Sequence, residues 1–109
     1  MTLAELKKLL EATGYPVAYF HFNESASKSP PDPPFITYSA PNTSNFMADN
    51  KVYKKITNAQ IELYTNIKDL EAEAKLEQLL DESNIPYEVD ETWIESEQLF
   101  QRIYDLGVI

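Results

Sequence analysis

The chain contains one histidine, His21, which is the side chain here that could act as a general base near neutral pH. Glu24 follows it by three residues and could orient the imidazole ring. A general base also needs a nucleophile or a substrate group within hydrogen-bond reach, and no serine motif or second histidine accompanies this pair. A histidine that makes a structural hydrogen bond at the end of a strand is therefore the favoured interpretation.

Paired carboxylates are the second feature that could support chemistry. Glu88 and Asp90 are two residues apart, as are Glu95 and Glu97, so each pair would share one face of a strand. Such pairs can hold Ca²⁺ or Mg²⁺ together with water molecules, but their spacing does not match the twelve-residue calcium loop. We interpret these four residues as a solvated acidic face. The acidic residues of the segment 69–82 are likewise expected to lie on a solvated helix surface.

Composition argues against other kinds of chemistry. The chain has two glycines and no cysteine, so it has no glycine-rich phosphate loop, disulfide or thiolate metal site. It has no run of about 18 apolar residues, and its N-terminus resembles a helix start more than a signal peptide. We therefore predict a protein that binds and assembles: not an enzyme, with no catalytic residue, no metal, no cofactor and no membrane contact.

Charge is distributed unevenly along the 109 residues. Residues 1–55 carry six basic and five acidic side chains, whereas residues 56–109 carry three basic and thirteen acidic ones, which together give the net charge of −9. This acidic half would repel DNA, RNA and anionic lipid, so specific nucleic-acid binding is not expected. It is either a solubilising surface, a surface that faces nucleic acid without adhering, or one that meets a basic partner.

Two helices are predicted, at about residues 3–13 and 69–82. Thr2 can cap the first, with Glu5 completing a capping box, and Gly14 and Pro16 end it. Asp69 can cap the second, and Asn84 ends it. The predicted apolar faces are Leu3, Leu6, Leu9 and Leu10 in the first helix, and Ala72, Leu76, Leu79 and Leu80 in the second.

The remaining segments alternate between strands and loops. Strands are predicted at 17–22, 35–39, 52–64 and 87–94, and loops at 24–34 and 41–51. In the longest strand Val52 and Ile56 have the opposite parity to Ala59, Ile61 and Leu63. This indicates a bulge or twist near residues 56–58, or an early half that projects as a hairpin arm. Residues 98–106 fit either a helix or a strand by periodicity.

The order α-β-β-β-α-β-β predicts an α+β fold in one domain, residues 1–109, with a mainly antiparallel sheet and both helices on one face. The chain is also rich in aromatic residues, and tyrosine and tryptophan are favoured at interfaces. Phe46 and Met47 stand in polar surroundings, Tyr53 flanks the same loop, and Trp93 lies on the strand after the second helix. We predict these four residues as interface positions.

Five segments in order give the chain a resemblance to a known family. They are LLEATGYPVAYFHF (9–22), PPFITY (33–38), DNKVYKK (49–55), QIELYT (60–65) and YEVDETWIESE (87–97). Together they resemble small prophage proteins of Gram-positive bacteria, of the tail-terminator or tail-completion type found in long-tailed phages. None of the segments carries a chemical signature, so the resemblance comes from their combination.

The resemblance implies an α+β subunit that forms a ring, commonly a hexamer, at the head-proximal end of the tail tube. Such a ring stops tube growth and meets the head connector, as part of a virion assembled in the bacterial cytoplasm. It also implies that residues 98–106 form a final strand. Two alternatives remain open: another phage neck component, such as a head-closure or adaptor protein, and an acidic module that binds a basic partner, such as a DNA mimic or antitoxin.

Overall fold

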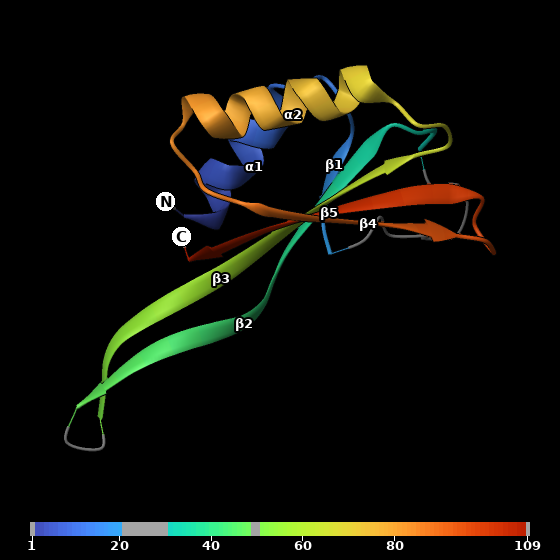
Figure 1. Ribbon diagram of the computed structural model, residues 1–109. Coiled ribbons are helices and arrows are strands. Elements are labelled where there is room, and N and C mark those ends of the chain that lie inside the picture. Colours follow the sequence, from blue (N-terminus) through green and yellow to red (C-terminus); the bar gives the residue numbers. More distant parts are fainter. Residues whose placement is uncertain (1, 21–30, 49–50, 109) are drawn as a thin grey trace.

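The computed structural model describes residues 2–20, 31–48 and 51–108. These residues form two helices and five strands in the order α-β-β-β-α-β-β, as predicted (Figure 1). The elements are α1 (Leu3–Glu11), β1 (Val17–Tyr19), β2 (Phe35–Ala48), β3 (Lys51–Thr65), α2 (Leu70–Glu82), β4 (Glu88–Ile94) and β5 (Leu99–Val108). The predicted α+β class is therefore confirmed.

The strands form a single sheet in the order β1-β2-β3-β5-β4. The pair β1–β2 is parallel, and the pairs β2–β3, β3–β5 and β4–β5 are antiparallel, so the sheet is mainly antiparallel as predicted. Both helices lie on one face of it (Figure 1). Residues 98–106, left open by periodicity, belong to a strand, because β5 pairs along its length between β3 and β4.

The helix ends follow the local signals in the sequence. The Thr2 hydroxyl accepts a hydrogen bond from the Glu5 backbone amide, and the Asp69 carboxylate accepts one from that of Ala72. Asn84 adopts φ 56°, the left-handed conformation that ends a helix. The helix α1 ends at Glu11, two residues before the predicted end, because the chain already turns at residue 12.

The core lies between the two helices and the sheet. Its buried members come from α1, α2 and the helix-facing side of β2, β3 and β5: Leu6, Leu10, Ile36, Tyr38, Ala59, Ile61, Leu63, Ala72, Leu76, Leu80, Tyr104 and Leu106. The predicted helix faces are nearly right. In α2, however, Leu79 is half-buried and Glu73 takes the buried position. Among the described residues, neither helix is long and apolar enough to cross a membrane.

The predicted loop at 41–51 is wrong for most of its length. β2 continues to Ala48 and β3 begins at Lys51, and their backbones pair from Phe35–Tyr64 to Ala48–Lys51. Asparagine and proline have low strand propensity, but the ladder with β3 supplies the pairing that overrides it. Most of the other predicted loop, 24–34, lies outside the described residues.

The bulge expected in the long strand near residues 56–58 is not in β3 at that point: the nearest register shifts lie beside Ala59, where the extra residues belong to β2 and β5, and the extra residue of β3 is Tyr53. Two residues of β2 (40 and 41) oppose Ala59 on one side, and the pairing of β3 with β5 also shifts there. Bulges bend a strand and increase its twist. They therefore mark the point where β2 and β3 leave the sheet.

Candidate functional site

The strands β2 and β3 extend past the sheet as a two-stranded arm, which we define as residues 42–48 and 51–57. β5 pairs with β3 only as far as Asn58, and β1 pairs with β2 only at residues 36–38. Within the described residues, the arm strands therefore pair only with each other (Figure 1). Seven residues of strand span roughly 23 Å. A two-stranded ribbon is marginally stable alone in water, so a partner would stabilise this arm.

The arm has a distinctive composition. Its two strand segments contain three lysines, Lys51, Lys54 and Lys55, and no acidic residue, in a chain whose net charge is −9. Three of the predicted interface residues also lie on it: Phe46 pairs with Lys54, Met47 pairs with Val52, and the register shift between these pairs falls at Tyr53. Their side chains lie outside the described part of the structure. The arm is thus a basic, apolar-rich extension of an acidic protein.

The opposite end of the molecule exposes apolar side chains, which we call the end patch: Ile67, Leu70 and Trp93. Their exposed fractions are 64%, 69% and 39%. They come from the connection between β3 and α2, the first turn of α2 and the end of β4. These segments meet because Thr65 of β3 pairs with Phe100 of β5, which pairs with Trp93. Figure 1 shows this end pointing away from the arm.

Trp93 is held in place within the end patch. Its ring packs edge-on against Phe100, with 4.7 Å between ring centroids. Its indole Nε1 donates a 2.6 Å hydrogen bond to Glu95 Oε2 in the β4–β5 turn. Two contacts thus fix an aromatic side chain that remains partly exposed. Such a side chain can be buried by a partner at low entropic cost.

Acidic residues neighbour the end patch along the chain. Glu95 and Glu97 lie in the turn that follows Trp93, Glu91 precedes it by two residues on β4, and Glu71 follows Leu70. The prediction that Glu95 and Glu97 share a strand face is wrong, because residues 95–98 form the turn between β4 and β5. Side chains in a turn do not alternate between two faces as they do in a strand. The two glutamates therefore belong to the turn that follows the exposed Trp93.

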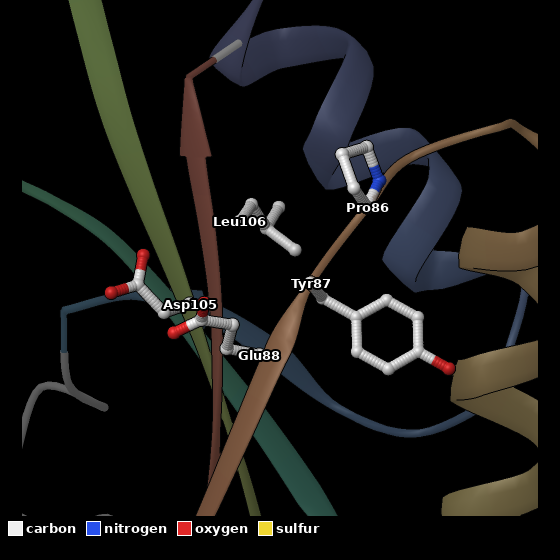
Figure 2. A pocket seen from close by; sticks show the side chains of 5 residues that line it. All are labelled: Pro86, Tyr87, Glu88, Asp105 and Leu106. Carbon is white, nitrogen blue, oxygen red and sulfur yellow. The ribbon is translucent and has the colours of Figure 1, made fainter.

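The other two residues of the predicted acidic face, Glu88 and Asp90, are exposed on β4. Glu88 pairs with Asp105 of β5, and Figure 2 shows both carboxylates on the same side of the ladder, while Tyr87 points toward α2. A shallow pocket of about 460 Å³ is lined by Glu88 and Asp105 together with Pro86, Tyr87 and Leu106. Like charges directly opposite each other are unfavourable. Charges along β4 also oppose edge-to-edge pairing with other strands, since β4 is an edge of the sheet.

An ionic network joins α2 to β4 and β5 on the helix-facing side. The Glu73 carboxylate is 2.8 Å from Lys68 Nζ and 3.4 Å from Arg102 Nε. The Arg102 guanidinium also approaches Glu77 at 3.5 Å and Glu91 at 3.6 Å. Its Nε donates to the Tyr104 hydroxyl, which in turn donates to Glu77, both at 2.9 Å.

This network explains why the expectation of a solvated acidic helix fails at Glu73. The side chain is 9% exposed, and burial of a carboxylate is tolerated because two cations compensate it. Hydrogen bonds to Glu73 and Glu91 raise the pKa of Lys68. Burial, aided by the Glu77 carboxylate, raises the pKa of the Tyr104 phenol, so Tyr104 acts as a hydrogen-bond donor at neutral pH. The network therefore fastens α2 to the sheet.

A smaller polar cluster lies on the sheet face away from the helices. Thr37 donates a 2.7 Å hydrogen bond to Glu62, and Gln101 donates one of 2.9 Å to Tyr64, whose ring stacks on Phe35. Burial raises the pKa of Glu62 although the Thr37 hydrogen bond opposes the shift. Burial and the nearby Glu62 charge raise the pKa of Tyr64. The cluster satisfies half-buried polar groups on this face of the sheet.

The structure thus separates the predicted residues into three places. Phe46, Met47 and Tyr53 lie on the arm, Trp93 with Glu95 and Glu97 at the opposite end, and Glu88 with Asp90 on the β4 edge. His21 and Glu24 lie outside the described residues. Sequence reasoning missed Ile67 and Leu70. A signal existed, because both flank Lys68 and Asp69 just before the apolar stripe of α2 and neither belongs to that stripe.

No protein-family model matches this chain, and no curated protein matches it in sequence. The functional interpretation therefore rests on the residues and on the geometry described above.

Proposed function

We propose that this protein is a structural assembly subunit of a long-tailed phage or prophage, of the tail-terminator type. It would join into a ring that caps the tail tube and meets the head connector, within a virion assembled in the bacterial cytoplasm. The proposal combines the resemblance of five sequence segments with the physical features of the fold.

The β2–β3 arm is the observation that carries the proposal. It projects from the sheet without another strand beside it in the described structure, although such ribbons are marginal in water. A protruding element of this kind is explained by a partner that it contacts in an assembly. The arm includes Phe46 and Met47, which the sequence already indicates as interface positions.

The acidic surface supports the same role. Glu88, Asp90 and Asp105 are exposed on neighbouring strands, and each would repel DNA phosphates. A ring through which DNA passes benefits from a bore to which DNA does not adhere. The proposal therefore includes self-association, contacts with the tube protein and the connector, and no catalytic activity.

Assembly of the purified protein tests the proposal. We expect concentrated wild-type protein to form closed rings, seen by negative-stain imaging and measured by light scattering. Replacing Phe46 and Met47 by serine should abolish rings while the circular dichroism spectrum and melting temperature stay unchanged. A double variant that assembles as wild type does would refute the role of the arm.

The same measurements separate the alternatives. An acidic inhibitor module would remain a monomer or dimer and would bind a basic protein in a salt-dependent manner. A different neck component is distinguished by gene order, because a tail-terminator gene should lie just upstream of the gene for the major tail protein.

A further inference from the structure

The arm and the end patch are complementary in charge and in apolar character. The arm strands contain three of the nine basic residues of the chain and no acidic residue. The end patch exposes Ile67, Leu70 and Trp93, and the residues next to them along β4, the β4–β5 turn and α2 include the acidic residues Glu71, Glu91, Glu95 and Glu97. On the basis of the proposed function, we infer that the arm of one copy docks on the end patch of the next copy.

The position of the two surfaces makes this contact intermolecular. The arm leaves the sheet at Asn58 and points away from the β4–β5 turn, so the two surfaces lie at opposite ends of the molecule (Figure 1). A contact between different surfaces of identical subunits is heterologous. It generates a ring when the rotation between subunits closes, and a filament when it does not.

Charge favours a second copy as the occupant of the end patch. The second half of the chain is strongly acidic, whereas the arm strands carry three lysines and no acidic residue, and in the described structure they pair only with each other. Docking would bring the strand that carries Lys51, Lys54 and Lys55 to the segments that carry Glu95 and Glu97. Opposite charges steer such an encounter, and apolar contact with the end patch stabilises it.

The held orientation of Trp93 strengthens the inference. Its ring packs against Phe100 and its indole nitrogen is bonded to Glu95, so little side-chain freedom remains to be lost on binding. Lys68, the basic residue beside Ile67, is bound to Glu73 and Glu91. Glu91 is likewise paired with Lys68 and Arg102, so the acidic charge beside the end patch comes mainly from Glu95 and Glu97, which have no cation partner among the ion pairs described.

Charge exchange between the two surfaces tests the inference. Lys54→Glu/Lys55→Glu on the arm and Glu95→Lys/Glu97→Lys beside Trp93 should each weaken self-association at least tenfold in sedimentation velocity experiments. An equimolar mixture of the two variants should restore self-association. The acidic arm of the first variant then meets the basic end patch of the second, and the basic arm of the second meets the acidic end patch of the first. Lys7→Glu/Lys8→Glu on the exposed surface of α1 is the matched control and should associate as wild type does.

Cysteine cross-linking gives a second readout, since the natural chain has no cysteine. A Lys55→Cys protein mixed with a Glu97→Cys protein should form a disulfide-linked heterodimer. In the control, the Lys55→Cys protein mixed with a Lys8→Cys protein should form one more slowly. Oligomers that persist in both charge variants, or equal cross-linking rates, would overturn the inference and leave self-assembly intact. A wild-type protein that forms no oligomer at any concentration, and no preferred cross-link, would overturn both.

Discussion

Arg102 is expected to be the most important charged side chain for the stability of the fold. Its guanidinium lies within 3.4 to 3.6 Å of three carboxylates, those of Glu73, Glu77 and Glu91, and it is 20% exposed. The change Arg102→Met keeps much of the aliphatic volume and removes the charge. Glu73 would then retain only Lys68 as a cationic neighbour among the ion pairs described.

The expected cost follows from burial. Removing one partner of a fully buried ion pair costs about 3–5 kcal/mol, because a buried charge is left uncompensated. Arg102 is partly exposed and Glu73 keeps its contact with Lys68, so we expect about 2–3 kcal/mol. For a domain of this size that loss lowers the melting temperature by about 10 °C.

Urea unfolding followed by circular dichroism measures this loss. The midpoint should fall while the m-value stays constant, because the same surface is exposed on unfolding. Lys75→Met is the control: its ammonium makes an exposed pair with Glu71 at 3.9 Å and lies over the Tyr15 ring, so its loss should cost under about 1 kcal/mol.

A second variant tests the mechanism of the loss. Adding Glu73→Gln to Arg102→Met should recover about 1 kcal/mol relative to Arg102→Met alone, because the uncompensated charge is then absent. Equal losses for Arg102→Met and Lys75→Met, or a double variant less stable than Arg102→Met, would refute the reasoning.

Two further predictions concern Glu62 and Asp69. Burial raises the pKa of Glu62, so the folded state binds this proton more tightly than the unfolded chain, and ionisation lowers stability as pH rises. Glu62→Gln should therefore be more stable than the wild type at pH 7, by less than about 1 kcal/mol, and as stable as the wild type below the ordinary glutamate pKa of 4.5. Urea unfolding at the two pH values measures the difference, and an advantage of the same size at both would contradict the prediction. Asp69→Ala removes the N-cap of α2 and should cost about 1 kcal/mol, whereas Asp69→Asn should lose much less; thermal unfolding compares them, and equal losses would argue against capping.

The helices illustrate what can be read from local sequence. Thr2, Asp69 and Asn84 act at the helix ends through contacts with residues no more than five positions away. Such contacts depend only on nearby residue types, so the helix bounds are predicted to within two residues. The predicted stripe of α2 is wrong at Glu73, which is buried while Leu79 is half-buried, because one of the two cations that compensate Glu73, Arg102, lies on the distant strand β5.

The arm shows the limit of local reasoning. Residues 41–48 have a loop-like composition, yet they form a strand because residues 51–58 lie opposite them. Whether they return to the sheet or leave it depends on how far β5 accompanies β3, and β5 is more than 40 residues away along the chain. The alternative of a hairpin arm could be stated from residue parity, but parity alone did not choose it over a simple bulge.

The sequence by itself determined the first six elements, the α+β class, the caps and the concentration of acidic charge in the second half, because each depends on residue type and short-range spacing. Only the tertiary structure decided that β5 is a central strand, that Glu73 is buried between Lys68 and Arg102, and that the basic arm and Trp93 lie at opposite ends. These features depend on which distant segments pack together. The packing is stabilised by contacts between residues far apart in the sequence, so no local pattern predicts it.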